Sequence, residues 1–290
     1  MTNILAREST LTGDDAAVRD DGWDSHGKGR MIGVGLVIPA GGAGDHFVSS
    51  VRQAVADPLI AAGYGLYTRV IDDADAEAET YRRWAASDGV AGVALLGGHD
   101  DAQRIELLRE LGLPFVAVVP SDDVGDFSAV AIDVAESVGV VDAFLSGRRH
   151  ERAVYMTGAM DSVTSRSREA ALAGRVEVVR TDGDVDKALV AARAVIEDGP
   201  ATLLFDSDVH ACAVTSDLLA AGRRVPEDAA ILSWTDSSLC RSSVPAITAV
   251  DRRGAEIGEM LGRRMLAVLA GGAPVVDRAP TPFIVSRASA

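Results

Sequence analysis

The sequence predicts an α/β protein with two doubly wound lobes, each built on a mainly parallel sheet. Short apolar runs alternate with segments of helical periodicity from residue 31 onward, which is typical of parallel strands joined by helical crossovers. The runs are apolar on both faces, as strands covered by helices on both sides must be. They also outnumber the strands of one mononucleotide-binding unit, which favours two units over one.

The first strand is expected over residues 31–39, where MIGVGLVIP is apolar throughout. The next helix covers 47–62, because apolar residues recur there at helical spacing and Gly63 supplies a stop. Further strands are expected at 65–71, 90–97, 114–120, 129–133, 152–158, 176–181, 201–206, 229–235 and 246–250. Further helices are expected at 75–87, 101–111, 134–146, 184–197, 210–221 and 252–269.

Charge and composition narrow the class of protein. The formal net charge of −15 argues against a nucleic-acid surface spread over the chain, because phosphate binding needs clustered Lys and Arg. Two cysteines, Cys212 and Cys240, indicate reduced thiols in a cytoplasmic protein. No apolar run has the length of a membrane span. Residues 1–30 have no apolar period and no secretory pattern, so we expect a flexible arm there.

Polar side chains gather where the expected strands end, and in open parallel sheets ligands bind beyond those ends. The sequence contains no GxGxxG, GxxxxGK[ST], HExxH, CxxC or GxSxG pattern. We therefore expect no metal, no cofactor and no catalytic residues, and we interpret these loops as a binding site. The polar strand-end segments are 39–47, 97–101, 120–123, 157–168, 205–211 and 233–241.

The segment TGAMDSVTSRSR at 157–168 is the most unusual of these loops. It places hydroxyl groups and two arginines where a strand gives way to a helix. We expect Arg168 within about the first turn of that helix, where its positive charge is locally unfavourable and calls for a ligand or an acid. Its planar fork of donors suits vicinal hydroxyls or a carboxylate. Arg168 is therefore either a ligand residue or the ion-pair partner of Asp161 or Asp208.

Other polar candidates also have structural alternatives. Among the histidines, His46 beside Asp45 is the best placed for a ligand contact, because both lie in a strand-end loop. Asp208 and Asp236 together suggest the carboxylate pair of a glycosidase. Each also stands at a helix start, where a carboxylate caps free N–H groups, and this second interpretation is favoured.

The C-terminal half contains a recognisable series of motifs. SD precedes a helix, G-x-x-VPED precedes a strand, a polar D-S loop follows, and VPAITAVD, a long helix and VSRAS complete the series. The chain from about residue 31 to 290 closely resembles the effector-binding domain of the lactose/galactose-repressor (LacI/GalR) family. The resemblance implies a type I periplasmic-binding-protein-like fold, with a small effector, usually a sugar, in a cleft between the lobes. The implied lobes are 31–132 with 249–276, and 133–248 with 277–290.

The resemblance also implies roles for individual residues in two loops. Arg168 stands where the family has an arginine that grips ligand hydroxyls, with Ser162 and Thr164 beside it. Ser207 and Asp208 stand where the family has a polar residue and an aspartate at a strand end. All five are expected to bind the ligand.

A third loop departs from the family pattern. Thr235 and Asp236 stand where the family typically has two aspartates, so Thr235 removes an acceptor for sugar hydroxyls. Val185 stands near where some relatives place a stacking aromatic. Trp234 is either a replacement for that ring or a buried core side chain. These departures leave the chemistry of the effector open.

Partners follow from the same comparison. Helix 47–62 has more apolar residues than the single face that packs on its own lobe needs. The remaining ones could contact a second copy, so we predict a twofold homodimer. Operator DNA would be reached only through a helix-turn-helix, for which residues 1–30 are too short. The apolar residues of helix 47–62 are Phe47, Val48, Val51, Val55, Leu59 and Ile60.

The sequence thus predicts the effector-sensing, dimerising part of a cytoplasmic transcriptional regulator, not an enzyme, with a small-molecule effector and no membrane contact. Two alternatives stay open. One is a solute-binding protein of a sugar transporter, which shares the fold, and the other is a hydrolase-type α/β enzyme.

Overall fold

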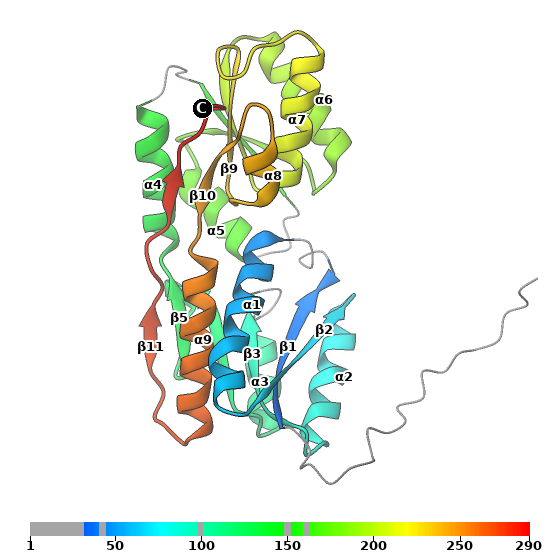
Figure 1. Ribbon diagram of the computed structural model, residues 1–290, viewed down its shortest axis with the longest axis vertical. Helices are drawn as coiled ribbons and strands as arrows, with labels where there is room; N and C mark the ends of the chain where they lie inside the picture. The colour runs from blue at the N-terminus through cyan, green and yellow to red at the C-terminus, as the bar shows by residue number, and fades with distance from the viewer. Residues whose placement is uncertain (1–31, 41–44, 98–100, 148–151, 159–162) are drawn as a thin grey trace, which may run out of the picture. The chain divides into compact units, whose positions relative to one another are not determined.

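Two six-stranded sheets, each flanked by helices, organise the protein (Figure 1). The first has the strand order β11-β5-β4-β3-β1-β2, and its paired strands are parallel. The second has the order β12-β10-β9-β8-β6-β7, and β12 is antiparallel to β10 while the other pairs are parallel. The predicted α/β class with two parallel-sheet lobes is confirmed. The computed structural model describes residues 32–40, 45–97, 101–147, 152–158 and 163–290.

Each sheet has its own set of elements. The first sheet comprises β1 (Gly33–Pro39), β2 (Gly65–Ile71), β3 (Val90–Leu96), β4 (Phe115–Pro120), β5 (Ala129–Ile132) and β11 (Val276–Arg278). With it go α1 (His46–Ala61), α2 (Ala74–Ala85), α3 (Asp101–Glu110), α9 (Gly254–Leu269) and the short helix η2 (Ser121–Asp123). The second sheet comprises β6 (Ala153–Thr157), β7 (Glu177–Arg180), β8 (Ala201–Phe205), β9 (Ala229–Ser233), β10 (Thr248–Asp251) and β12 (Phe283–Val285). With it go α4 (Val134–Ser146), α5 (Val163–Leu172), α6 (Val185–Glu197), α7 (Asp208–Ala220) and α8 (Ser238–Ser242).

The chain passes between the sheets after β5, after β10 and after β11. The last two passages lie a few residues beyond the predicted lobe boundaries, which is a correction. Residues 249–251 belong to β10, which pairs with β9 and β12 of the second sheet. Residues 277–278 belong to β11, which pairs with β5 of the first sheet. Both strands keep pairing up to the edge of their sheet, and an apolar run alone does not indicate which sheet it joins. The predicted arm, residues 1–30, lies outside the described residues.

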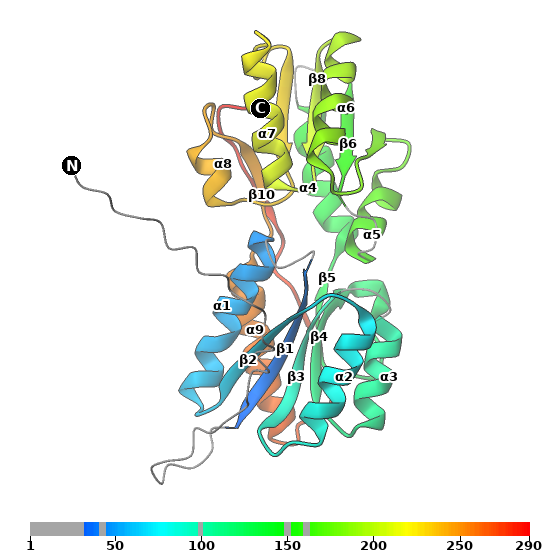
Figure 2. The ribbon, with the colours of Figure 1, turned by 90° about the vertical axis from the view of Figure 1, so that its right-hand side faces the viewer.

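Helices α1 and α9 pack together on one face of the first sheet, with α2 and α3 on the other (Figure 2). Glycines on α9 allow the close approach. A Cβ atom on Gly258 would lie 2.5 Å from the carbonyl oxygen of Val51, and one on Gly262 would lie 2.8 Å from that of Val55. The apolar side chains of α1 are therefore largely used in packing within the protein, and not free for a dimer contact as the sequence suggested. Ile60 is the exception and is 63% exposed.

Replacing Gly258 with valine is expected to lower the melting temperature. The new side chain would collide with the backbone of α1, and overpacking of this kind costs about 1–3 kcal/mol. A matched control is Gly139→Ala on α4, where a Cβ meets nothing within 4 Å and helix propensity improves. Thermal melting followed by circular dichroism measures both. A Gly258→Val protein that melts like the parent would contradict the close packing of α1 and α9.

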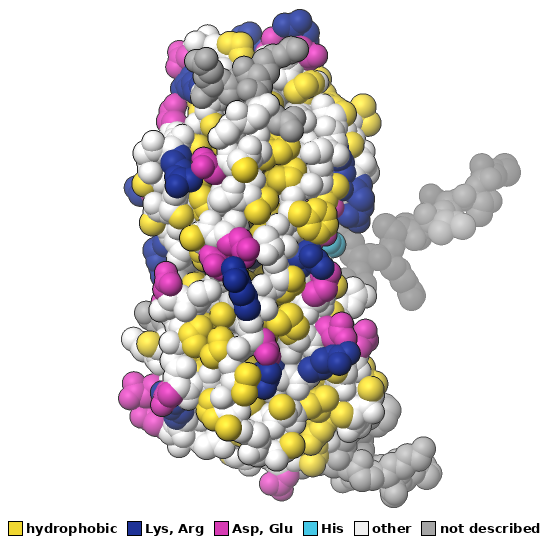
Figure 3. Space-filling model, turned by 90° about the vertical axis from the view of Figure 1, so that its left-hand side faces the viewer, with side chains coloured by type: hydrophobic (Ala, Val, Ile, Leu, Met, Phe, Trp, Pro, Cys, Tyr) yellow, Lys and Arg dark blue, Asp and Glu magenta, His cyan; other side chains and the backbone are white. Residues whose placement is uncertain are grey.

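The surface carries no continuous basic area on the face drawn in Figure 3, where basic and acidic side chains adjoin one another. Among the described ion pairs, Arg278 lies 3.3 Å from Asp133 and 3.0 Å from Glu136. Within the ranges that the structure describes, no helix combines the length and the apolar character needed to cross a membrane.

Candidate ligand-binding cleft

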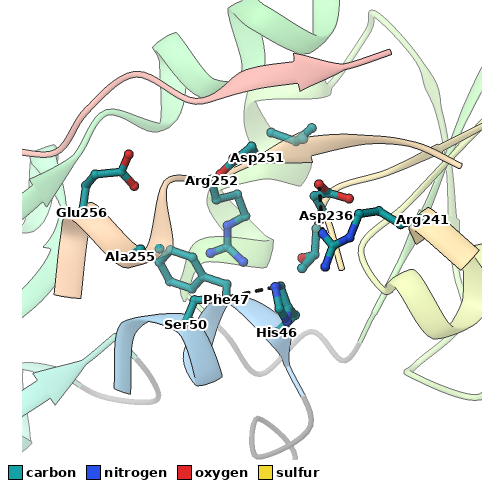
Figure 4. A pocket seen from close by; sticks show the side chains of 12 residues that line it. His46, Phe47, Ser50, Asp236, Arg241, Asp251, Arg252, Ala255 and Glu256 are labelled. Carbon is teal, nitrogen blue, oxygen red and sulfur yellow. Dashed lines mark hydrogen bonds and ion pairs between the residues drawn. The ribbon is translucent and has the colours of Figure 1, made fainter. Parts of the chain in front are cut away.

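A polar cavity of about 180 Å³ lies between elements of the two sheets (Figure 4). One wall is the first turn of α1, with His46, Phe47 and Ser50. The other comes from the segments after β9 and β10, including Thr235 and Arg252. A cavity of about 150 Å³ holds a molecule of the size of benzene, so this space suits one small ligand.

Strand order explains why these segments meet. β9 and β10 are parallel neighbours, so the loops that follow them leave the same edge of the sheet. The amide of Trp234 donates to the carbonyl oxygen of Phe205 at 2.7 Å, and the amide of Asp236 donates to that of Val250 at 3.1 Å. The loop after β9 is thereby held to both neighbouring strands, which positions Thr235 at the cavity.

Asp236 lines this cavity, but its carboxylate already has a partner. Arg287 donates to both of its oxygens at 2.8 Å, and both side chains are largely buried. The hydrogen bond to Asp236 raises the pKa of Arg287. Arg287 also donates to the carbonyl oxygen of Ile247 at 2.7 Å, so this pair fastens the C-terminal segment to the cavity wall. Arg241 lies 3.6 Å from the same carboxylate.

Arg168 is buried and paired with an acid that the sequence did not single out. Its Nη1 donates to Oδ1 of Asp206 at 3.2 Å, and its guanidinium carbon lies 4.6 Å from the centre of the Trp234 ring. Asp206 also accepts from Tyr155 Oη at 2.5 Å and from the amide of Gly158 at 3.0 Å. Burial and the adjacent Asp206 raise the pKa of Tyr155, which therefore donates as a neutral phenol.

The predicted position and partners of Arg168 need correction. It is the sixth residue of α5, about one turn further from the helix start than predicted, so repulsion by the helix dipole is weaker than assumed. Its acid is Asp206 and not Asp208, because Asp206 lies directly at the end of β8, beside β6. The other suggested partner, Asp161, lies outside the described residues.

Arg252 is a second buried guanidinium, at the carboxyl end of β10. Its Nη1 lies 3.7 Å from Oδ2 of Asp45, and its guanidinium carbon lies 3.7 Å from the centre of the Phe47 ring. Burial, and then repulsion by Arg168, lower the pKa of Arg252 to about 9. It is still a cation at neutral pH, in surroundings that compensate its charge incompletely.

Five of the predicted residues lie at two adjoining spaces. His46, Thr235 and Asp236 line the main cavity, whereas Arg168 and Trp234 line a smaller space of about 20 Å³. Phe47 and Arg252 border both spaces and connect them.

Asp45 contributes indirectly to this site. It caps α1 by accepting the amide of Phe47 at 2.7 Å, and it faces Arg252.

Other predicted residues have structural roles or are not described. Ser207 caps α7 by accepting the amide of His210, and Asp208 accepts the amide of Val209 at 3.0 Å. Neither lines either of the two spaces, so their expected role as ligand residues stays a prediction. Ser162 lies outside the described residues, as does the side chain of Thr164.

Sequence reasoning missed Phe47 and Arg252 as cavity residues. The signal for Arg252 was present, because it directly follows an expected strand, and residues in that position approach the ligand in parallel sheets. In the described part of the chain, no three metal-ligating side chains gather as a metal site.

Comparisons with known proteins agree with this architecture. The family described as periplasmic binding protein-like domain matches residues 142–290. The HTH-type transcriptional regulator CelR of Thermobifida fusca is 30% identical over 210 residues, which are 67% of this chain and 60% of the relative. The chain thus spans 60% of the length of that curated protein.

Solved structures extend the likeness to most of the chain. A LacI family transcriptional regulator from Bifidobacterium animalis subsp. lactis is 25% identical with a TM-score of 0.79, and the match covers 88% of this chain and 96% of that one. A complex of the regulator CelR with cellobiose has the same fold, at 24% identity and a TM-score of 0.76 over 90% of this chain and 86% of that one. The chain therefore belongs to the periplasmic binding protein-like domain family, as an effector-binding domain of the LacI/GalR type.

Proposed function

We propose that this chain is the effector-sensing and dimerising part of a cytoplasmic transcriptional regulator, and that it binds a small molecule in the cavity between its two sheets. The observation that carries the proposal is the origin of the cavity wall. His46 and Ser50 come from an element of the first sheet, and Thr235 and Asp236 from the second. A ligand bound there contacts both halves at once.

Such a contact couples binding to the arrangement of the lobes. Arg252 and Gly254 line the cavity and belong to the passage from β10 to α9, which connects the two sheets. A ligand that binds one arrangement more tightly shifts the population toward it. Binding would in this way change the relative orientation of the lobes and be transmitted to a DNA-binding part.

A sugar or sugar-like ligand is the first class to test. The regulator CelR is known in complex with cellobiose, and that protein shares this fold. Here the cavity is polar, and the rings of Phe47 and His46 border it. Thr235 offers a hydroxyl where a carboxylate would strengthen binding of a neutral sugar, so the effector need not be the same.

The homodimer remains part of the proposal, on a different surface from α1. Three apolar side chains are exposed in the first turn of α7 and at or just after α8: Val209 at 51%, Leu239 at 45% and Val244 at 83%. Helices α7 and α8 pack against each other, which brings these segments to one region of the second lobe. Sedimentation velocity at micromolar concentration is expected to give a dimer, and a monomer at all concentrations would contradict it.

The effector-sensing function is tested by thermal-shift screening against sugars, nucleosides and small acids, followed by calorimetry on each ligand that stabilises the protein. We expect saturable, stoichiometric binding without chemical conversion of the ligand. In the source organism, disruption of the gene and addition of the effector should change transcription of a shared small set of genes. Turnover of a ligand, or unchanged transcription in both cases, would overturn the regulatory function.

A further inference from the structure

We propose that the effector carries an oxyanion group, a carboxylate or a phosphate, and that Arg252 binds it. This inference rests on the proposed function, because it names the chemical class of ligand for the same cavity. It does not follow from the family, in which the effector is usually a neutral sugar.

The first support is the unsatisfied hydrogen-bonding capacity of Arg252. A guanidinium has five N–H donors and no acceptor. Among the described residues Arg252 has one acid, Asp45, whose oxygen is 3.7 Å from Nη1 and beyond hydrogen-bond distance. The Arg252 side chain is only 14% exposed. Figure 4 shows its guanidinium pointing into the space between His46, Phe47 and Asp236. Its donors therefore face the cavity and not bulk water.

The second support is that the acids around the cavity already have partners. Asp236 accepts two hydrogen bonds from Arg287. Glu256 pairs with Arg253 at 2.6 Å.

The remaining acids are engaged by backbone amides as well. Asp251 Oδ1 accepts the amide of Arg253 at 2.8 Å, and Asp45 Oδ1 accepts that of Phe47 at 2.7 Å. Asp206 satisfies Tyr155, Gly158 and Arg168. Each of these acids thus has at least one hydrogen-bonded or ion-paired partner, whereas Arg252 has no acceptor within hydrogen-bond distance among the described residues.

The third support is electrostatic. Arg168 and Arg252 both border the smaller space, and each is largely buried. Burial, and then repulsion by Arg168, lower the pKa of Arg252, which means that the protein alone stabilises this cation poorly. A negative charge in the cavity would compensate it, whereas a neutral hydroxyl would supply only a weak acceptor.

A neutral sugar fits this arrangement less well. Its hydroxyl groups must donate as well as accept, and two of the cavity carboxylates that could receive those donations, Asp236 and Glu256, are already paired with arginines. Thr235, in the loop where the family has an acid facing the ligand, supplies a hydroxyl instead. A guanidinium binds a carboxylate or phosphate through two parallel hydrogen bonds, which matches the geometry of the free fork of Arg252.

The test compares simple oxyanions and matched sugars on three proteins. The parent chain, Arg252→Gln and Arg263→Gln are titrated with inorganic phosphate and with sulfate at constant ionic strength, by thermal melting and calorimetry. Arg263 is the control, because the same substitution there removes an arginine that is 72% exposed, pairs with Glu259 and lines neither space. We expect saturable stabilisation of the parent and of Arg263→Gln. Affinity should be at least tenfold weaker in Arg252→Gln, the loss expected for a charge-assisted hydrogen bond.

Glucose, glucuronate and glucose 6-phosphate distinguish this inference from the proposed function. Stabilisation by the two charged sugars that depends on Arg252 supports the inference. Binding of glucose that is equal in the parent and in Arg252→Gln, without oxyanion binding, overturns the inference and leaves the proposed function intact. No anion-dependent stabilisation of any of the three proteins also overturns the inference.

The fold of the variants is checked without ligand. Arg252→Gln is expected to melt at or above the temperature of the parent, because it removes a poorly compensated buried cation. If it instead melts much lower, Arg252→Lys decides, since a lysine keeps the charge and should retain weakened phosphate binding. If the lysine variant is folded but does not bind phosphate, the positive charge is not sufficient and the planar guanidinium is required. Unchanged phosphate binding in a folded glutamine variant would overturn the role of Arg252.

Discussion

Replacing Trp234 with alanine is expected to lower the free energy of unfolding by about 3–5 kcal/mol, the usual cost of removing a large buried aromatic side chain. The ring is 1% exposed and belongs to the core cluster on the face of the second sheet that α4 covers. Its centre lies 5.9 Å from that of Tyr155, and Arg168 lies over its face. The alanine variant therefore loses core packing and also the surface on which Arg168 rests.

Urea unfolding of Trp234→Ala, Trp234→Phe and the surface control Leu239→Ala measures this effect. Phenylalanine keeps an aromatic face and should recover most of the loss, whereas Leu239 is 45% exposed and its truncation should cost little. Ligand affinity is then measured on Trp234→Phe, which stays folded. If Trp234→Ala is as stable as the parent while ligand affinity falls, the ring is a ligand platform and not a core side chain.

Much of the fold was predictable because its elements have local causes. The apolar run at β1 and the helical period of α1 are each visible within one window of sequence. The helix starts are local too, since Asp73, Asp133 and Asp184 accept hydrogen bonds from amides only two or three residues away. β11 and β12 were not predicted as strands. They are 3 residues long each, and their pairing is decided by strands far away in the sequence.

The site was predictable in part, for the same reason. The rule that ligands lie beyond strand ends selected His46 and Thr235, and both line the cavity. Hydrogen-bond partners were beyond sequence reasoning when they depended on the fold. Asp206 and Arg168 are 38 residues apart, and Asp236 and Arg287 are 51 residues apart. A loop rich in possible partners does not indicate which one the tertiary structure selects.

The second large effect concerns Arg168 and Asp206. Removing one member of a buried ion pair typically costs about 3–5 kcal/mol, because the other charge is left without its partner. Both side chains are less than a tenth exposed, at 8% and 9%. In Arg168→Ala, Asp206 would keep the hydroxyl of Tyr155 and the amide of Gly158, so a loss near the lower end, about 3 kcal/mol, is expected. Asp206→Asn removes the charge with little change in shape. It is expected to cost a similar amount, since it leaves the buried guanidinium of Arg168 without a charged partner.

A double-mutant cycle separates the pair from the individual residues. Arg168→Ala with Asp206→Asn should lose less stability than the sum of the two single losses, by about 1–3 kcal/mol, the coupling expected for contacting residues. Strict additivity in urea unfolding would mean that the two side chains do not stabilise each other. Ligand affinity adds a separate result, because an arginine that is only structural changes melting and not binding in the folded double variant. We expect both the melting temperature and the ligand affinity to fall. Arg168 borders the smaller space and packs on Trp234, and only one of its five donors is hydrogen-bonded to Asp206.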